Sequence, residues 1–282
     1  MVSGILPGIF TKRTVRGFAA PISLTLAFCF APVMQAKDGC TNQNFVGAFG
    51  FYGTGFVIKS PVTTLQGPFA RAGRFVSDGN GNLTFSSTAS FNGYVFPQDF
   101  TGTYTIKPDC TFNTEVFLPD PINLPVKFIG VLSDGGNEIR DLFVDPAGVL
   151  VYGTARKQGL GQCANSDLFG TYQFELSGST LQPTGNRINF AGLGRLVADG
   201  EGNAVGTLGS NYAGLSLQED VSGTYEMQPN CIFQLKYYTA GEGTSAKDGV
   251  TLKGIMIDGG TGAYLMVLAP NTATMLGSLK LQ

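Results

Sequence analysis

A ten-residue stretch that occurs twice constrains the fold of this chain more than any other feature. Gly73-Arg-Phe-Val-Ser-Asp-Gly-Asn-Gly-Asn82 returns as Gly194-Arg-Leu-Val-Ala-Asp-Gly-Glu-Gly-Asn203, with seven of ten positions identical and an offset of 121 residues. Each copy is an alternating apolar run that ends in an Asp-Gly-x-Gly-Asn turn. This pattern is typical of a β-hairpin, because glycine reaches positive φ and Asp and Asn bond their own backbone in tight turns. We therefore expect two related β units.

Three further blocks repeat in the same order, with offsets of 121 to 124 residues. They are 100–112 with 221–233, 130–136 with 254–260, and 153–158 with 277–282. A period near 120 residues exceeds the roughly 20–50 residues of solenoid and propeller repeats. Each repeat should therefore be a whole domain, and we place the two domains at 40–158 and 163–282.

The strand pattern predicts an all-β fold. Each repeat contains eight apolar runs of strand type, and no helical stripe is evident outside the N-terminal segment. The third run of the second repeat is expected to span Ala204–Leu217. Eight strands joined by short turns favour two tandem eight-stranded antiparallel up-and-down barrels, which leave no exposed sheet edge. Two β-sandwiches are the alternative.

The first 36 residues predict a secretory signal peptide. They carry Lys12, Arg13 and Arg16 and no acid, then an apolar stretch over 17–33, then Met-Gln-Ala36. An uncleaved anchor is the alternative, although the stretch is shorter than the roughly 20 residues of a membrane span. We expect a secreted or periplasmic protein with no membrane span in the mature chain.

Four cysteines remain after the predicted cleavage, and an even number in an exported chain indicates disulfides. Each repeat has one cysteine at its start and one after its fourth strand. Pairing Cys40 with Cys110 and Cys163 with Cys231 treats both repeats alike. Pairing between the repeats is the alternative.

Charge and composition exclude several functions. The mature chain has a net charge of about −5 and no basic run, which argues against nucleic acid and anionic membranes as partners. The absence of histidine excludes Ser–His–Asp and Cys–His catalysis and His-ligated zinc. Asp78, Asn80 and Asn82 alternate like early calcium ligands, but the glycine and glutamate that such a loop needs are missing. We therefore expect residues 78–82 to form a turn and not a calcium site. We expect no metal and no cofactor in this protein.

Two pairs of residues are candidates for ligand binding. Arg74 and Arg195 each lie inside an apolar strand, four residues before the turn aspartate. An inward arginine in a barrel would hold a carboxylate with its planar fork, and an outward one would be structural. Tyr104 and Tyr225, in the shared Gly-Thr-Tyr, would either donate a hydrogen bond inside a cavity or pack as core aromatics.

The repeated blocks at 73–82 and 102–112 resemble a group of largely uncharacterised exported bacterial proteins, similar to the allene oxide cyclase-like and lipocalin-like small barrels. The resemblance covers both repeats and implies an eight-stranded barrel with an apolar cavity, in a superfamily of cyclases and ligand carriers. It supplies no catalytic residue for this chain.

Three functions remain open at this point. The first is a non-enzymatic exported protein whose barrels hold a small apolar ligand or pack solid. The second is a cyclase or isomerase that uses an apolar cavity with an Arg, Tyr or carboxylate. The third is a surface or adhesion module, since duplication raises avidity. A sixteen-stranded outer-membrane barrel fits poorly, because about 15 residues per strand leave little for loops. The sequence does not determine an oligomeric state.

Overall fold

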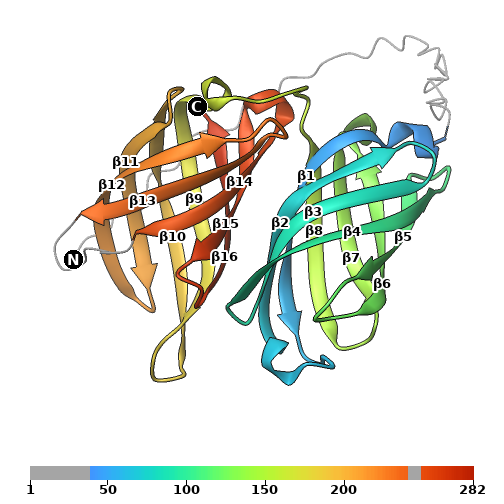
Figure 1. The fold of residues 1–282 in the computed structure, drawn as a ribbon, viewed down its shortest axis with the longest axis horizontal. Helices are drawn as coiled ribbons and strands as arrows, with labels where there is room; N and C mark the ends of the chain where they lie inside the picture. The colour runs from blue at the N-terminus through green and yellow to red at the C-terminus, as the bar shows by residue number, and fades with distance from the viewer. Residues whose placement is uncertain (1–38, 241–248) are drawn as a thin grey trace, which may run out of the picture. The chain divides into compact units, whose positions relative to one another are not determined.

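The computed structural model describes residues 39–240 and 249–282, and the predicted signal peptide lies outside the described residues. These residues form two closed eight-stranded antiparallel barrels (Figure 1). The strands of the first barrel are β1 (Val46–Val57), β2 (Gly67–Asp78), β3 (Asn82–Phe91), β4 (Tyr94–Ile106), β5 (Thr111–Leu118), β6 (Leu124–Ser133), β7 (Glu138–Asp145) and β8 (Val149–Lys157). Those of the second are β9 (Phe169–Leu181), β10 (Arg187–Asp199), β11 (Asn203–Tyr212), β12 (Leu215–Met227), β13 (Ile232–Ala240), β14 (Val250–Ile257), β15 (Gly262–Ala269) and β16 (Ala273–Leu281).

Each strand pairs with its neighbours in the chain, and the first strand of each barrel also pairs with the last. Pairing of β1 with β8, and of β9 with β16, closes the two barrels. The predicted fold class is therefore confirmed, and the barrel rather than the sandwich is the architecture. Five short 3-10 turns complete the described elements: η1 (Asn42–Asn44), η2 (Thr63–Leu65), η3 (Asp134–Gly136), η4 (Asn165–Asp167) and η5 (Asp258–Gly260). No helix in the described ranges is long and apolar enough to cross a membrane.

Alternation along the strands sends one set of side chains into each barrel. In β5, for example, Phe112, Thr114, Val116 and Leu118 are buried, and the residues between them are more exposed. This two-residue period is what a strand with one buried face requires.

The repeated ten-residue block ends in the turn that joins β2 to β3. Asp78 Oδ1 accepts hydrogen bonds from the backbone N–H groups of Asn80 and Asn82, at 2.7 and 3.0 Å, and Oδ2 accepts one from Asn82 Nδ2 at 2.6 Å. These bonds hold the pKa of the Asp78 carboxyl below its usual value. Asp199 makes the equivalent bonds between β10 and β11. The block is thus a self-satisfied hairpin turn in both barrels.

One strand prediction is wrong. The run expected over Ala204–Leu217 is divided by a turn at Ala213-Gly214, where φ is 48° and 98°. The matching turn of the first barrel is Asn92-Gly93, with φ of 53° and 93°. Asparagine tolerates the left-handed region and signals a turn, whereas alanine gives no such signal.

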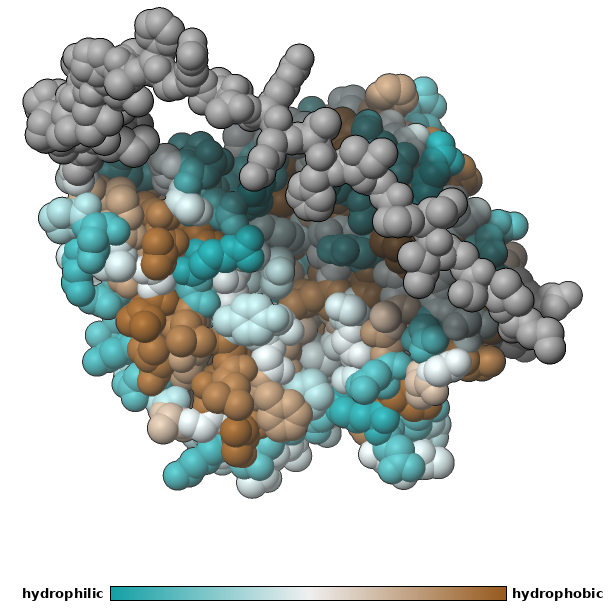
Figure 2. All heavy atoms as spheres, turned by 180° about the vertical axis from the view of Figure 1, so that it is seen from behind, coloured by the Kyte–Doolittle hydropathy of each residue, from teal (hydrophilic) through white to brown (hydrophobic). Residues whose placement is uncertain are grey.

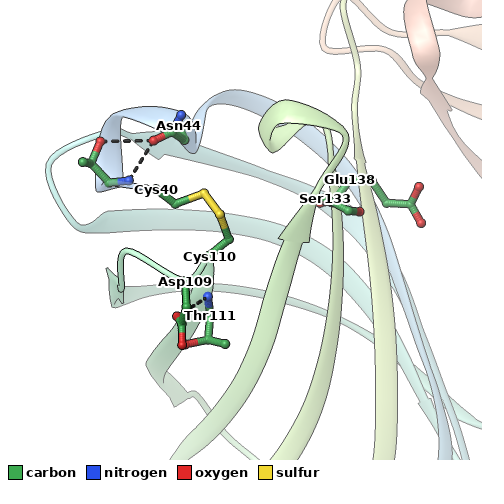
Figure 3. Close-up of a disulfide and its surroundings, with 8 residues drawn as sticks. Cys40, Asn44, Asp109, Cys110, Thr111, Ser133 and Glu138 are labelled. Atoms are coloured by element: carbon green, nitrogen blue, oxygen red, sulfur yellow. Dashed lines mark hydrogen bonds between the residues drawn. A yellow bond between two sulfur atoms is a disulfide. The ribbon is translucent and has the colours of Figure 1, made fainter. Parts of the chain in front are cut away.

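A disulfide fastens the start of each repeat across one end of its barrel, and Figure 3 shows the bridge of the first barrel. Cys40 is bonded to Cys110, and Cys163 to Cys231, which is the pairing that the sequence predicted. Beside each bridge an asparagine side chain accepts a hydrogen bond from the barrel wall: Asn42 Oδ1 from the Ile106 N–H at 2.9 Å, and Asn165 Oδ1 from the Met227 N–H at 2.8 Å. Bridges that close loops of 70 and 68 residues are worth about 4 kcal/mol each on the chain-entropy model.

The two interiors are packed differently. Inward side chains of the second barrel form one continuous buried cluster, which includes Tyr172, Phe174, Leu252 and Leu265. Those of the first barrel fall into three separate clusters, around Phe45, Phe69 and Phe100. Separate clusters inside one closed barrel indicate a gap between them.

The barrels also contact each other. Arg156 of β8 donates from Nη1 to Asp258 Oδ2 at 2.7 Å and from Nη2 to Glu138 Oε2 at 2.6 Å. A buried apolar cluster with members on β2 and β14, among them Ala72 and Ile255, accompanies this ion pair. The contact therefore combines apolar burial with a charge network.

The packing difference predicts different responses to one substitution. Leu252→Phe should lower the free energy of unfolding by about 1–3 kcal/mol, because the side chain is fully buried in a filled core. Leu124→Phe in the first barrel should change it by less than about 0.5 kcal/mol, because this side chain is only half-buried. Urea unfolding of both variants checks this. Equal losses of stability in the two barrels would contradict the difference in packing.

Candidate functional site

The interior of the first barrel contains a cavity of about 130 Å³. Its wall includes ten phenylalanines, and the polar lining is small. At one end the lining residues are Lys59, Ser60, Pro61 and Pro146, which lie in the loops after β1 and β7. An engineered apolar cavity of about 150 Å³ in another protein binds benzene, so this cavity has room for a single ring.

The residues at equivalent positions of the two repeats explain why side chains fill the interior of the second barrel. Phe51, Phe128 and Phe143 each keep some accessible surface toward the cavity. Their counterparts in the repeat, Phe174, Leu252 and Val267, are only 1%, 0% and 1% exposed. Gly53, which also lines the cavity, corresponds to Leu176, whose side chain is buried in the second core. The cavity thus exists where the first repeat has a glycine and loosely packed rings.

Arg71 is the charged group buried in the cavity wall. It lies on β2, is 6% exposed, and its guanidinium carbon lies 5.7 Å from the ring centroid of Phe69 and 5.1 Å from that of Phe100. One Nη2 hydrogen bond goes to Gln98 Oε1, and Nε has no partner among the described residues. Burial lowers the pKa of Arg71 to about 9.

Asp141 faces the same cavity from β7. Arg71 pairs across the sheet with Gly53, Gly53 with Gly153, and Gly153 with Asp141. The two charged residues therefore occupy one row of the wall, separated by two glycines that have no side chains to fill the space. Burial raises the pKa of Asp141 to about 6, opposed by hydrogen bonds from backbone N–H groups.

The structure places the predicted arginines away from this cavity. Arg74 is half-buried, and its Nε donates to Gln158 Oε1 at 2.8 Å. Arg195 donates from Nη2 to Thr171 Oγ1 at 3.2 Å on an exposed part of the second barrel. Alternation explains the outcome, because Phe75 lines the cavity and its neighbour Arg74 must face outward. Ligand binding by either arginine stays a prediction.

The predicted tyrosines bond to the backbone near the start of each repeat. Tyr225 Oη donates to the carbonyl of Leu168 at 2.7 Å. Tyr104 is 3% exposed and lies within hydrogen-bond distance of the carbonyls of Asn42 and Phe45, at 3.2 and 3.3 Å. Both hydroxyls therefore have backbone partners near the start of their repeat. A role in ligand binding stays a prediction for them too.

Sequence reasoning missed Arg71 and Asp141, although a signal was present. Comparison of the repeats at the offset of 121 places Gly192 opposite Arg71, so the arginine belongs to the first repeat alone. Phenylalanine is also unevenly divided, with 14 residues in 40–158 and four in 163–282. Neither residue lies in a block that the two repeats share.

Exposed apolar side chains gather on the outer wall of the first barrel. They include Ile129 on β6, Leu142 on β7 and Tyr152 on β8, which are direct cross-strand neighbours, and each is at least 45% exposed. A band of hydrophobic surface is visible in Figure 2. A patch of this kind marks an interaction surface more often than chance, but nothing in the described residues identifies what would cover it.

Comparisons with known proteins identify no function for this chain. No family model matches the chain, and no curated protein matches it. Among solved structures, a crystal structure of a mutant of the vaccine antigen Transferrin Binding Protein B from Haemophilus parasuis Hp5 matches at 8% identity, over 83% of this chain and 76% of that chain, with a TM-score of 0.29. This likeness is too weak to carry an argument. The eight-stranded barrels agree coarsely with the expected lipocalin-like architecture, and the resemblance to allene oxide cyclase is not confirmed.

The raised pKa of Asp141 predicts a pH dependence of stability. The folded state binds the proton more tightly than the unfolded state, whose Asp pKa is about 3.9, so stability is lost as pH rises from about 4 to about 6. Asp141→Asn should remove this loss and raise the free energy of unfolding at pH 7.5 by up to about 3 kcal/mol.

Thermal unfolding of wild type and variant between pH 4 and pH 7.5 measures the effect. Asp220→Asn, at an exposed position on β12, is the matched control and should follow the wild type. Parallel profiles for Asp141→Asn and the wild type would contradict the proposed burial of this carboxyl.

Proposed function

We propose that this chain is an exported, non-enzymatic binding protein that holds a small apolar ligand inside its first barrel. The observation that carries the proposal is the phenylalanine-lined cavity of about 130 Å³. Small-molecule sites are concave, mostly apolar and equipped with few polar groups, and this cavity has each of these properties. Its partner would be a molecule about the size of a single aromatic ring with a short substituent.

The second barrel would then be a packed support. Its interior is one continuous cluster, and the glycine at position 53 is replaced there by the buried Leu176. Two domains at 40–158 and 163–282 are consistent with this division of roles. Duplication followed by filling of one copy would leave a single binding barrel per chain.

Export is supported by the disulfides. Bridges persist in oxidising compartments and are rare in the cytosol, and each repeat has one. Together with the basic and apolar N-terminal segment of the sequence, they favour a periplasmic or extracellular location.

One observation favours a second candidate, an isomerase or cyclase. A carboxyl with a pKa near 6 inside an apolar cavity is suited to proton transfer at neutral pH, and Asp141 is such a group. In this reading Asp141 would move a proton on a bound substrate whose apolar body contacts the phenylalanines. The reaction would change the ligand without changing its mass.

Closing the cavity tests the binding proposal. Gly53→Leu copies the filled barrel, and a Cβ at position 53 would meet neighbours only at 3.7–3.8 Å, which is ordinary contact. Binding of toluene, followed by ligand-observed NMR, should be at least about tenfold weaker in this variant, because occupied volume excludes the ligand. Its melting temperature should be unchanged or higher.

Gly161→Leu is the matched control, since it adds the same atoms at a position with nothing within 4 Å. It should bind toluene like the wild type. Native mass spectrometry of wild-type protein adds a second readout, because a co-purified small molecule should be lost in Gly53→Leu and kept in Gly161→Leu. Absence of any saturable toluene binding by the wild type would overturn the proposal.

The enzymatic candidate has its own test. A co-purified molecule, once recovered, is incubated with wild type and with Asp141→Asn and then separated by chromatography. A shift in retention at constant mass with the wild type alone would favour the isomerase. An unchanged molecule with both proteins would exclude that reaction for it.

A further inference from the structure

We propose that the ligand of the first barrel is an apolar carboxylic acid, bound as its carboxylate by the Arg71 guanidinium, with its apolar body against the phenylalanines of the cavity. This inference rests on the proposed function and names its ligand class. It is carried by three features: a buried arginine without a counter-charge, its fixed orientation, and its absence from the filled barrel.

The first feature is that the buried guanidinium of Arg71 has no counter-charge. Arginine has five N–H donors, but within the described ranges Arg71 makes one side-chain hydrogen bond, to Gln98, and its Nε makes none. No carboxylate of the described residues forms an ion pair with it. A buried charge without a counter-charge is costly, so the site is stabilised when an anion enters.

The second feature is preorganisation. The guanidinium is held by Gln98 Oε1 while Gln98 Nε2 donates to the carbonyl of Pro119 at 3.3 Å. The rings of Phe69 and Phe100 lie within 6 Å of the guanidinium carbon and restrict it further. A donor group held in place in this way loses little entropy on binding.

The shape of the donor group selects the anion. A guanidinium presents parallel N–H groups that match the two oxygens of a carboxylate. A phosphate would bring a third oxygen and up to two charges into an apolar cavity with one arginine, and part of it would stay unsatisfied. Asp141, on the far side of the two glycines, repels an anion and so favours placement of the carboxylate at Arg71.

The third feature is that the second barrel lacks an arginine at the position equivalent to Arg71. In the second barrel Gly192 replaces Arg71, and a Cβ there would lie 2.9 Å from the Phe190 ring, so the space is already occupied. Glu219 replaces Gln98 and accepts a hydrogen bond from Ser210. The barrel therefore closes and packs without this arginine. A buried arginine that the fold does not require, next to a cavity, points to a ligand.

A matched probe series tests the ligand class on the full-length mature protein. The probes are 3-phenylpropionate, its neutral amide and the cationic 3-phenylpropylamine, with affinities measured by isothermal titration calorimetry at pH 7.5. Wild type should bind the acid about tenfold to a hundredfold more tightly than the amide, because a charge-assisted pair is gained. The amine should bind most weakly.

Variants separate Arg71 from the rest of the cavity. Arg71→Met should bind acid and amide equally while keeping the amide affinity of the wild type. Gln98→Glu keeps the arginine but supplies a counter-charge inside the protein. This variant should also lose the preference for the acid over the amide. Arg74→Met makes the same change at the outward arginine three residues away and should behave like the wild type.

The outcomes distinguish the two proposals. If wild type binds acid and amide with equal affinity, the carboxylate inference is wrong and the proposed function stands. If neither probe nor toluene binds, the proposed function fails as well. A preference for the acid that survives in Arg71→Met would assign it to another group and overturn the role of Arg71.

Discussion

The volume enclosed by eight strands is the constraint on which the rest of this structure depends. A barrel of this size has an interior that side chains just fill, or that holds one small ligand. Closure satisfies the backbone and removes both sheet edges, so inward side chains decide only what fills the space. Both barrels have the same strand order and the same closing pairs. They differ in whether those side chains meet in the middle.

Duplication made this difference visible within one chain. The hairpin turns at Asp78 and Asp199, the disulfides, and the tyrosines bonded near the start of each repeat are shared, because they hold the barrel itself. Leu176 and Leu252 complete a continuous core in the second barrel. Gly53 and the half-buried rings of the first leave a cavity with Arg71 and Asp141 in its wall. The shared residues thus hold the barrel together, and the differing inward residues form the cavity.

Much of the fold could be predicted because its signals are local. A two-residue period, glycine-rich turns and symmetric cysteines each act over short stretches or recur in both repeats. The one strand error, over Ala204–Leu217, came from a turn at Ala213 whose left-handed backbone its residue type does not signal. For the site, the sequence directed attention to Arg74 and Arg195. Arg74 faces outward and contacts Gln158, and the cavity arginine lies three residues earlier in the same strand.

The sequence by itself therefore determined the all-β class, the duplication and eight strands per repeat, and it favoured the cysteine pairing within each repeat that the structure shows. It also excluded histidine chemistry throughout the chain. Only the tertiary structure decided which barrel is hollow and which arginine faces the cavity. The physical reason is that inward facing depends on strand register, and a shift by one residue reverses every side chain. Whether opposed side chains meet depends on their summed volume across the barrel, and that sum involves residues from eight strands spread over more than a hundred positions.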